Sequence, residues 1–117
     1  MSQPESNMPN RRRSRRGGVR SQARIECRKG ALGLGPNLAL AGLDISETGI
    51  RLIVKALLAS GQDVEIVLSG IGARKPLKRL GRVIWSLALE DGRSCAGVSF
   101  DKPLPYADVQ SFARTTC

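Results

Sequence analysis

The sequence predicts an all-β protein: a small antiparallel barrel of six strands, followed by one short helix. Three observations lead to this prediction. The chain has 117 residues, the size of one compact domain. Its hydrophobic fraction of 41% is enough for a single core. From residue 19 onward, short alternating segments are separated by glycine, proline, asparagine and aspartate, a pattern typical of successive strands. A sandwich fits the same pattern, but a closed barrel leaves no free edge strands.

Three strands are expected in the first half of the chain. In residues 19–27 (VRSQARIEC), small or apolar residues alternate with polar ones, as in a half-buried strand. Residues 28–37 (RKGALGLGPN) are rich in glycine, which indicates a loop or a loose strand end. Residues 38–45 and 49–54 are apolar enough to form the second and third strands.

Three further strands and a helix are expected in the second half. Residues 63–68 (DVEIVL) alternate cleanly. Residues 77–89 (LKRLGRVIWSLAL) fit a helix or a strand by periodicity, and their β-branched and aromatic residues favour a long strand bent at the internal glycine. The tripeptide Glu90-Asp91-Gly92 is a hairpin signal, so residues 93–100 complete the pair. Residues 106–114 (YADVQSFAR) have apolar positions at helical spacing and predict a short helix on the sheet.

These elements divide the chain into segments. Residues 1–10 are polar and cannot bury a core, so we expect a disordered leader. Residues 11–18 (RRRSRRGG) are expected to form a flexible basic arm, whose two glycines loosen its join to the first strand. The barrel is assigned to residues 19–100 and the helical segment to 104–115. Residues 11–117 therefore form one domain.

The net charge of +9 is concentrated near the N-terminus. The first 30 residues hold nine basic and two acidic side chains, a local charge of +7. The other 87 residues hold ten basic and eight acidic side chains, a charge of only +2. Neighbouring arginines repel one another, so such a cluster binds phosphate or another anion more readily than it forms a fold element.

Several function classes are disfavoured by the composition. The chain has no histidine, which excludes Ser-His, Cys-His and His-metal chemistry, and it shows no other credible catalytic set. Cys27, Cys95 and Cys117 are too widely spaced to suggest a disulfide framework or a zinc site, so we expect a reduced, cytoplasmic setting without a metal or cofactor. We expect no transmembrane helix and no secretory signal. The aromatic share of 3% leaves few residues on which single-stranded nucleic acid could stack.

Two motifs stand out against this background. The first is RRRSRR at residues 11–16, which contains two overlapping R-x-x-x-R pairs. The second is DISETG at residues 44–49, a D-x-S-x-x-G at the turn between the second and third strands. In this order, and ahead of a strand that ends in GVSF at residues 97–100, they resemble the PilZ domain family of bacterial cyclic di-GMP receptors. The resemblance covers the chain from about residue 11 to the C-terminus and implies a PilZ-like barrel that binds a ligand without catalysis.

The chemistry of cyclic di-GMP accounts for these residue types. The ligand carries two phosphodiesters and two guanines, and the arginine fork matches both phosphate oxygens and the guanine O6 and N7 atoms. Lysine would supply the charge without the fork. The resemblance implies that Asp44 accepts hydrogen bonds from a guanine edge or orients an arginine of the arm, that Ser46 offers a hydroxyl, and that Gly49 permits a positive φ and a close approach of the ligand.

The resemblance also assigns roles within the arm. Arg12 and Arg16 are implied as the R-x-x-x-R pair because they leave the usual short gap before the first strand, and Arg11 with Arg15 is the alternative register. An extra arginine before the pair, here Arg11, is associated in the family with binding a stacked ligand dimer. Arg13 can join by its position inside the motif.

Other interpretations of the same residues stay open. Trp85 matches a tryptophan often found on the strand before G-V-x-F and packs near or against a guanine, or it is a residue of the core or its rim. Asp44 and Ser46 are also good turn formers. The family often has apolar residues after the arginine motif, where this chain has Gly17-Gly18, so a looser arm is expected.

The resemblance thus predicts a cyclic di-GMP receptor whose arm closes over the ligand and which signals to a partner protein, with no membrane span. Two alternatives remain. The chain is a small basic barrel that binds nucleic acid non-specifically through its arm, or it is a PilZ-like interaction module that no longer binds the ligand.

Overall fold

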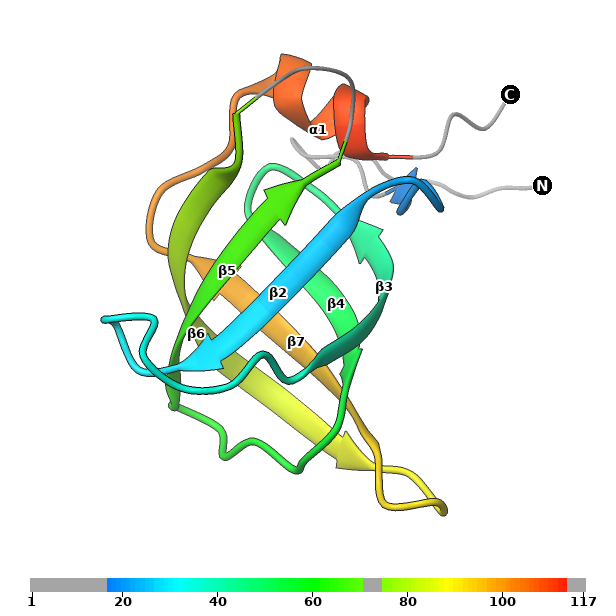
Figure 1. Cartoon of the computed structure of the whole chain (residues 1–117), viewed down its shortest axis with the longest axis vertical. Helices are drawn as coiled ribbons and strands as arrows, with labels where there is room; N and C mark the ends of the chain where they lie inside the picture. The colour runs from blue at the N-terminus through cyan, green and yellow to red at the C-terminus, as the bar shows by residue number, and fades with distance from the viewer. Residues whose placement is uncertain (1–16, 71–74, 114–117) are drawn as a thin grey trace, which may run out of the picture.

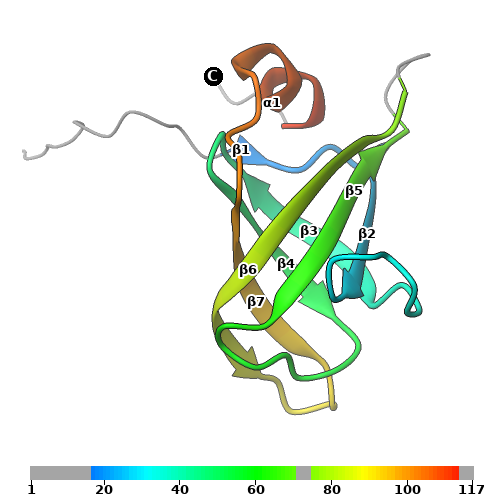
Figure 2. The same ribbon diagram turned by 90° about the vertical axis from the view of Figure 1, so that its left-hand side faces the viewer.

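The computed structural model describes residues 17–70 and 75–113. Seven strands and one helix lie in this part of the chain: β1 (Gly17–Gly18), β2 (Arg24–Lys29), β3 (Ala39–Ile45), β4 (Gly49–Val54), β5 (Asp63–Ser69), β6 (Leu77–Ala88), β7 (Ser94–Phe100) and α1 (Tyr106–Phe112). Neighbouring strands pair antiparallel in the order β1-β3-β4-β7-β6-β5-β2. The six longer strands curl into a nearly closed barrel (Figures 1 and 2), which confirms the predicted fold class.

The barrel closes where β2 and β3 approach each other. The side chain of Asn37 bridges this seam, because its Oδ1 accepts hydrogen bonds from the backbone N–H of Cys27 at 2.9 Å and of Ala39 at 3.0 Å. The N–H of Leu38 adds a bond to the carbonyl of Cys27 at 2.7 Å. One amide side chain therefore satisfies backbone groups that would otherwise face an open edge.

The first predicted strand is shorter than expected. It was predicted over residues 19–27, whereas β2 begins at Arg24 because a turn occupies Ser21 and Gln22. Ahead of this turn, Val19 is buried and forms a bridge with Ala113, and the N–H of Arg20 donates to the carbonyl of Phe112. Because the turn is two residues long, apolar and polar side chains alternate in the same phase before and after it, and the sequence pattern does not show the interruption.

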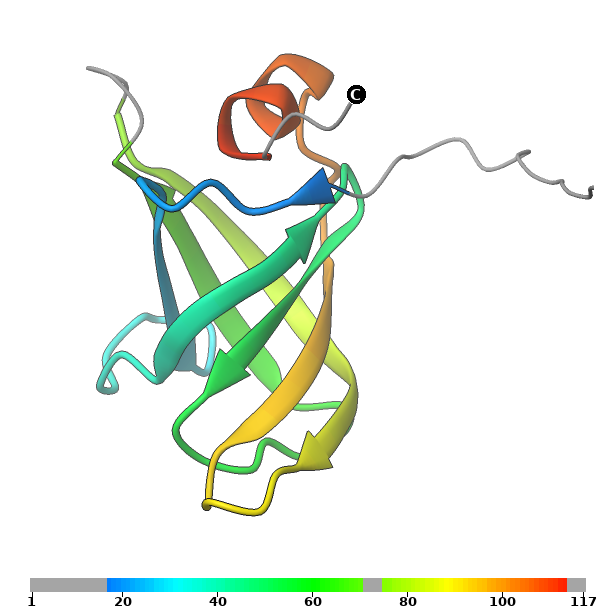
Figure 3. The same cartoon turned by 90° about the vertical axis from the view of Figure 1, so that its right-hand side faces the viewer.

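Gly17 and Gly18, where we expected a loose join, lie in a short strand. Both glycines form β1, in which Gly17 lies opposite Ile45 and Gly18 opposite Asp44 of β3. Figure 3 shows this short strand lying along the end of β3, below α1.

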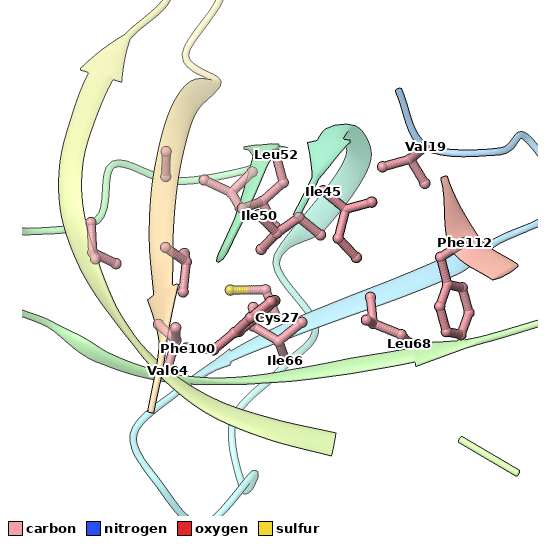
Figure 4. Close-up of a cluster of buried hydrophobic side chains, with 14 of the residues drawn as sticks. Val19, Cys27, Ile45, Ile50, Leu52, Val64, Ile66, Leu68, Phe100 and Phe112 are labelled. Atoms are coloured by element: carbon pink, nitrogen blue, oxygen red, sulfur yellow. The ribbon is translucent and has the colours of Figure 1, made fainter. Parts of the chain in front are cut away.

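The core fills the barrel with side chains from every one of the six longer strands. Cys27, Ile50 and Ile66 are completely buried, and Figure 4 shows them facing one another across the interior. Burial disfavours the thiolate and raises the pKa of the Cys27 thiol to about 11. At one end of the barrel, Val109 and Phe112 of α1 are buried in the same cluster. The helix begins after Pro105 and falls within the segment predicted for it.

The long strand β6 carries a bulge at a position that the sequence did not indicate. The pairing with β7 shifts between Val83 and Trp85, so Ile84 is an extra residue there, whereas the pairing at Gly81, where we expected a bend, is regular. Gly81 instead allows close packing, because a Cβ there would collide with the side chain of Val98.

Candidate functional site

Four strands contribute one residue each to a row across the outer face of the barrel. Asp44 of β3 lies opposite Arg51 of β4, Arg51 lies opposite Gly97 of β7, and Gly97 lies opposite Trp85 of β6. Gly18 of β1 extends this row beyond Asp44. We call these five residues the outer row; the strands β3, β4 and β7 that carry its middle are in front in Figure 3.

Two irregularities in the sheet place the ends of the outer row on this face. The pairing of β3 with β4 shifts between Gly42 and Asp44, which makes Leu43 an extra residue and aligns Asp44 with Arg51. The extra residue Ile84 does the same for Trp85, which regular alternation would have placed on the same face as the buried Val83. A bulge of one residue reverses the face that the following side chains occupy.

Asp44 and Arg51 form an ion pair at one end of the outer row. The Nε–H of Arg51 donates to Oδ2 of Asp44 at 2.6 Å, and its Nη2 contacts the same oxygen. The hydrogen bond and the charge of Asp44 raise the pKa of Arg51 above its ordinary value. Asp44 is buried, with 8% of its surface exposed, whereas the Arg51 side chain is 47% exposed. The pair therefore presents the guanidinium to solvent and holds the carboxylate beneath it.

Arg51 was not predicted as a site residue. For Asp44 we expected a hydrogen bond from a guanine edge or a role in orienting an arginine of the arm, and both stay predictions. Within the described residues, Asp44 also accepts a hydrogen bond from an arginine of the neighbouring strand. The available signal was that Arg51 is the one charged residue in the apolar segment GIRLIV at residues 49–54.

Ser46 and Gly49 shape the turn that follows Asp44. Ser46 is buried, its N–H donates to the carbonyl of Gly49 at 2.9 Å, and its Oγ accepts a hydrogen bond from the N–H of Thr48 at 3.3 Å. The turn-forming interpretation of Ser46 is confirmed, and its contact with a ligand stays a prediction. Gly49 does not adopt a positive φ, contrary to expectation. Its Cα faces β7 so closely that a Cβ would collide with the carbonyl oxygen of Val98.

Trp85 lies outside the barrel and over Gly97. A Cβ on Gly97 would collide with Nε1 of the indole. The ring can lie over this position only because Gly97 has no side chain. Trp85 retains 37% exposure. Trp85 is therefore not a core residue; a place at the rim and a role at a ligand both stay open to it.

The arm residues named as ligand-binding candidates, Arg11, Arg12, Arg13 and Arg16, lie outside the described residues. The structure places Asp44 and Trp85 on the outer row with Arg51 and Gly97 between them, and Ser46 and Gly49 in the turn that follows Asp44. It also ties Gly17 and Gly18, which follow the arginine motif directly, to the strand that ends in the D-x-S-x-x-G motif.

Among residues 17–70 and 75–113, no three histidine, cysteine or carboxylate side chains gather in a group that could hold a metal ion. The same part of the chain has no helix of the length and apolarity needed to cross a membrane.

Comparison with known families decides what this arrangement belongs to. A model of the PilZ domain matches residues 10–114, which takes in both motifs and the whole barrel. The chain belongs to the PilZ domain family. PilZ domains form a family of cyclic di-GMP receptors, which bind a ligand or a partner and are not a catalytic family. A search of curated proteins found no match to this PilZ domain.

Proposed function

We propose that this PilZ domain binds cyclic di-GMP on the outer row and closes its arginine arm over the ligand. The pairing of β1 with β3 carries the proposal, because it sets Gly17 opposite Ile45 and Gly18 opposite Asp44. Arg16 is bonded to Gly17, so their Cα atoms are about 3.8 Å apart, and the Cα of Arg12 is within about 18 Å of that of Gly17. The arginine motif is therefore joined directly to a strand that lies beside the start of the D-x-S-x-x-G motif.

The outer row supplies the groups that the ligand requires. The forks of Arg12 and Arg16 suit phosphate oxygens and the O6 and N7 atoms of guanine. The carboxylate of Asp44 suits the N1–H and N2–H edge of a guanine, with Arg51 holding it in position. Trp85 adds an exposed aromatic surface at the other end of the row, against which a base can pack.

Closure of the arm is the step that would carry the signal. Ordering the arm on the ligand costs conformational entropy, which offsets part of the binding energy, and it creates a surface that the free protein lacks. We infer that a partner protein reads this surface and that the domain catalyses no reaction itself. The free thiols of Cys27 and Cys95 suit a reducing cytoplasm.

Calorimetric titration with cyclic di-GMP tests the proposal. We expect saturable binding by the intact chain and at least tenfold weaker binding by Arg16→Ala and by Asp44→Ala, because each removes a charge-assisted contact of about 1.5–3 kcal/mol. Arg93→Ala is the matched control for Arg16→Ala. It removes one positive charge from the β6–β7 hairpin, at the end of the barrel away from β1 (Figure 1), and should leave the affinity within twofold.

Two results would contradict this proposal in different ways. If the intact chain shows no saturable binding, the domain is an interaction module without this ligand. If it binds but Arg16→Ala and Asp44→Ala bind equally well, the ligand occupies another surface.

The charge of +7 in the first 30 residues keeps non-specific nucleic-acid binding as a second candidate. That function predicts that an oligonucleotide competes with cyclic di-GMP and that its affinity falls steeply between about 50 mM and 200 mM salt. Titration of both ligands at the two salt concentrations distinguishes the candidates.

A further inference from the structure

The loop between β2 and β3 holds two leucines in solvent. Leu32 is 77% exposed and Leu34 is 83% exposed, the largest values among the big apolar side chains of the described residues. Neither contributes to the core, and both lie away from the outer row. Figure 1 shows this loop, in cyan, projecting from the side of the barrel. Two exposed leucines in one short loop mark a candidate contact site where they lie beside other exposed apolar surface.

The loop is anchored to the barrel at both of its ends. The N–H of Gly30 donates to the carbonyl of Asp63 at 2.8 Å, and Gly33 packs so closely on the carboxylate of Glu65 that a Cβ would collide with it. Gly30 and Gly33 adopt φ values of +86° and +65°, which glycine allows at little cost. Asn37 fixes the other end of the loop through its bonds to Cys27 and Ala39. Both ends of the loop that carries the leucines are therefore held to the barrel.

A hollow lies directly beside this loop. Its volume is about 500 Å³, and its wall includes Ala31 of the loop, Leu80 and Ile84 of β6, and Phe100 of β7. Leu80 is 39% exposed and Ile84 is 55% exposed. One surface thus carries an apolar projection, Leu32 and Leu34, next to an apolar recess of a size that accepts a leucine side chain.

From this juxtaposition we propose that the surface formed by Leu32, Leu34 and the hollow is a self-association site, occupied by a second copy of this chain. In a two-fold dimer the same patch meets itself, and a projection beside a recess gives the self-complementary shape that such a contact needs. The leucines of each copy enter the hollow of the other.

The charges around the hollow support a second copy as the occupant. Asp63, Asp101 and Arg82 all line it, and Arg82 pairs with Asp63 at 3.2 Å. A rim with both signs can oppose its own copy, since an acid of one chain can face a base of the other. An anionic membrane or an acidic partner would be matched instead by a uniformly basic rim.

The size of the patch predicts a weak dimer. Stable interfaces bury about 800 Å² on each partner, and a few apolar side chains supply only part of such an area. Association should therefore depend on concentration over the micromolar to millimolar range.

Sedimentation velocity without cyclic di-GMP tests this proposal independently of the proposed function. Between about 10 μM and 1 mM, a range that brackets weak association, the intact chain should shift from 12.6 kDa toward twice that mass. Leu34→Asp and Ile84→Asp should remain monomeric over the whole range, because each places a charge in an apolar contact. Leu57→Asp makes the same charge change at a leucine that is 62% exposed on the loop between β4 and β5, and it should associate like the intact chain.

Far-UV circular dichroism checks that the variants are folded, as expected at positions that are more than half exposed. An intact chain that stays monomeric at every concentration overturns the proposal. If that chain binds vesicles of anionic lipid, the surface instead contacts a membrane. Leu34→Asp and Ile84→Asp proteins that associate like the intact chain overturn it as well, because the interface then lies elsewhere.

Discussion

The ion pair between Asp44 and Arg51 determines how the D-x-S-x-x-G motif is presented. Asp44 is nearly buried, and a buried carboxylate without a partner is costly. Arg51 supplies two donors to one carboxylate oxygen from the neighbouring strand. This arrangement fixes the orientation of Asp44 before any ligand arrives, which lowers the entropy cost of binding.

We expect Arg51→Ala to weaken cyclic di-GMP binding about tenfold and to lower the free energy of unfolding by about 1 kcal/mol, since the carboxylate of Asp44 loses a fixed partner. Arg51→Lys keeps the charge without the fork, so its affinity and its stability should both lie between those of the intact chain and those of Arg51→Ala. Calorimetry and urea unfolding give the two quantities. Loss of stability with unchanged affinity would limit the pair to a structural role.

At the scale of the strands, bulges and close contacts decide which side chains reach the outer row. The extra residues Leu43 and Ile84 turn Asp44 and Trp85 outward, and Gly97 leaves room for the indole. Gly49 belongs to the same set, because it allows β4 to approach β7 at the start of their pairing. The outer row therefore depends on the packing of β4 against β7 and on the register of β3 and β6.

Gly49→Ala should destabilise the barrel by about 1–3 kcal/mol, because its Cβ collides with the rigid carbonyl of Val98. Urea unfolding followed by the fluorescence of Trp85 measures the change. Gly35→Ala is the matched control, since its Cβ meets no atom within 4 Å and its φ is not positive. Equal stability of the two variants would show that the contact between β4 and Val98 relaxes without cost.

At the scale of the whole molecule, the barrel interior holds a titratable group that reports on folding. Cys27 has no exposed surface, and burial raises the pKa of its thiol from 9.0 to about 11. In the unfolded chain the thiol ionises near its ordinary pKa, so above pH 9 the unfolded state releases a proton that the folded state retains. The stability that this group contributes is complete below about pH 9 and is lost as the pH rises toward 11.

The free energy of unfolding of the intact chain should accordingly fall by roughly 1 kcal/mol more than that of Cys27→Ala between about pH 8 and 10. The comparison cancels every pH effect that the two proteins share. Urea unfolding of the two proteins at both pH values makes the measurement. An identical pH dependence would mean that the thiol is ionised as easily inside the barrel as outside.

Much of the fold was predictable because strands and turns leave local traces. The alternation in residues 63–68 and the turn at Glu90-Asp91-Gly92 each depend on neighbouring residues alone, and both predictions agree with β5 and the β6–β7 hairpin. The first strand was predicted too long because no such trace marks its true start. The turn at Ser21 and Gln22 preserves the alternation, so the local pattern does not reveal it.

The fold class, the family resemblance and the two motifs can all be read from the amino-acid sequence, since composition, alternation and motif order are properties of the chain. Which groups meet was settled by the folded structure. It turned Trp85 out of the core, paired Asp44 with Arg51 and set β1 beside the D-x-S-x-x-G motif. The physical reason is that a bulge or a cross-strand pair depends on the register between two strands. Register is set by how both strands pack in the closed barrel, and the pattern of either strand alone does not contain it.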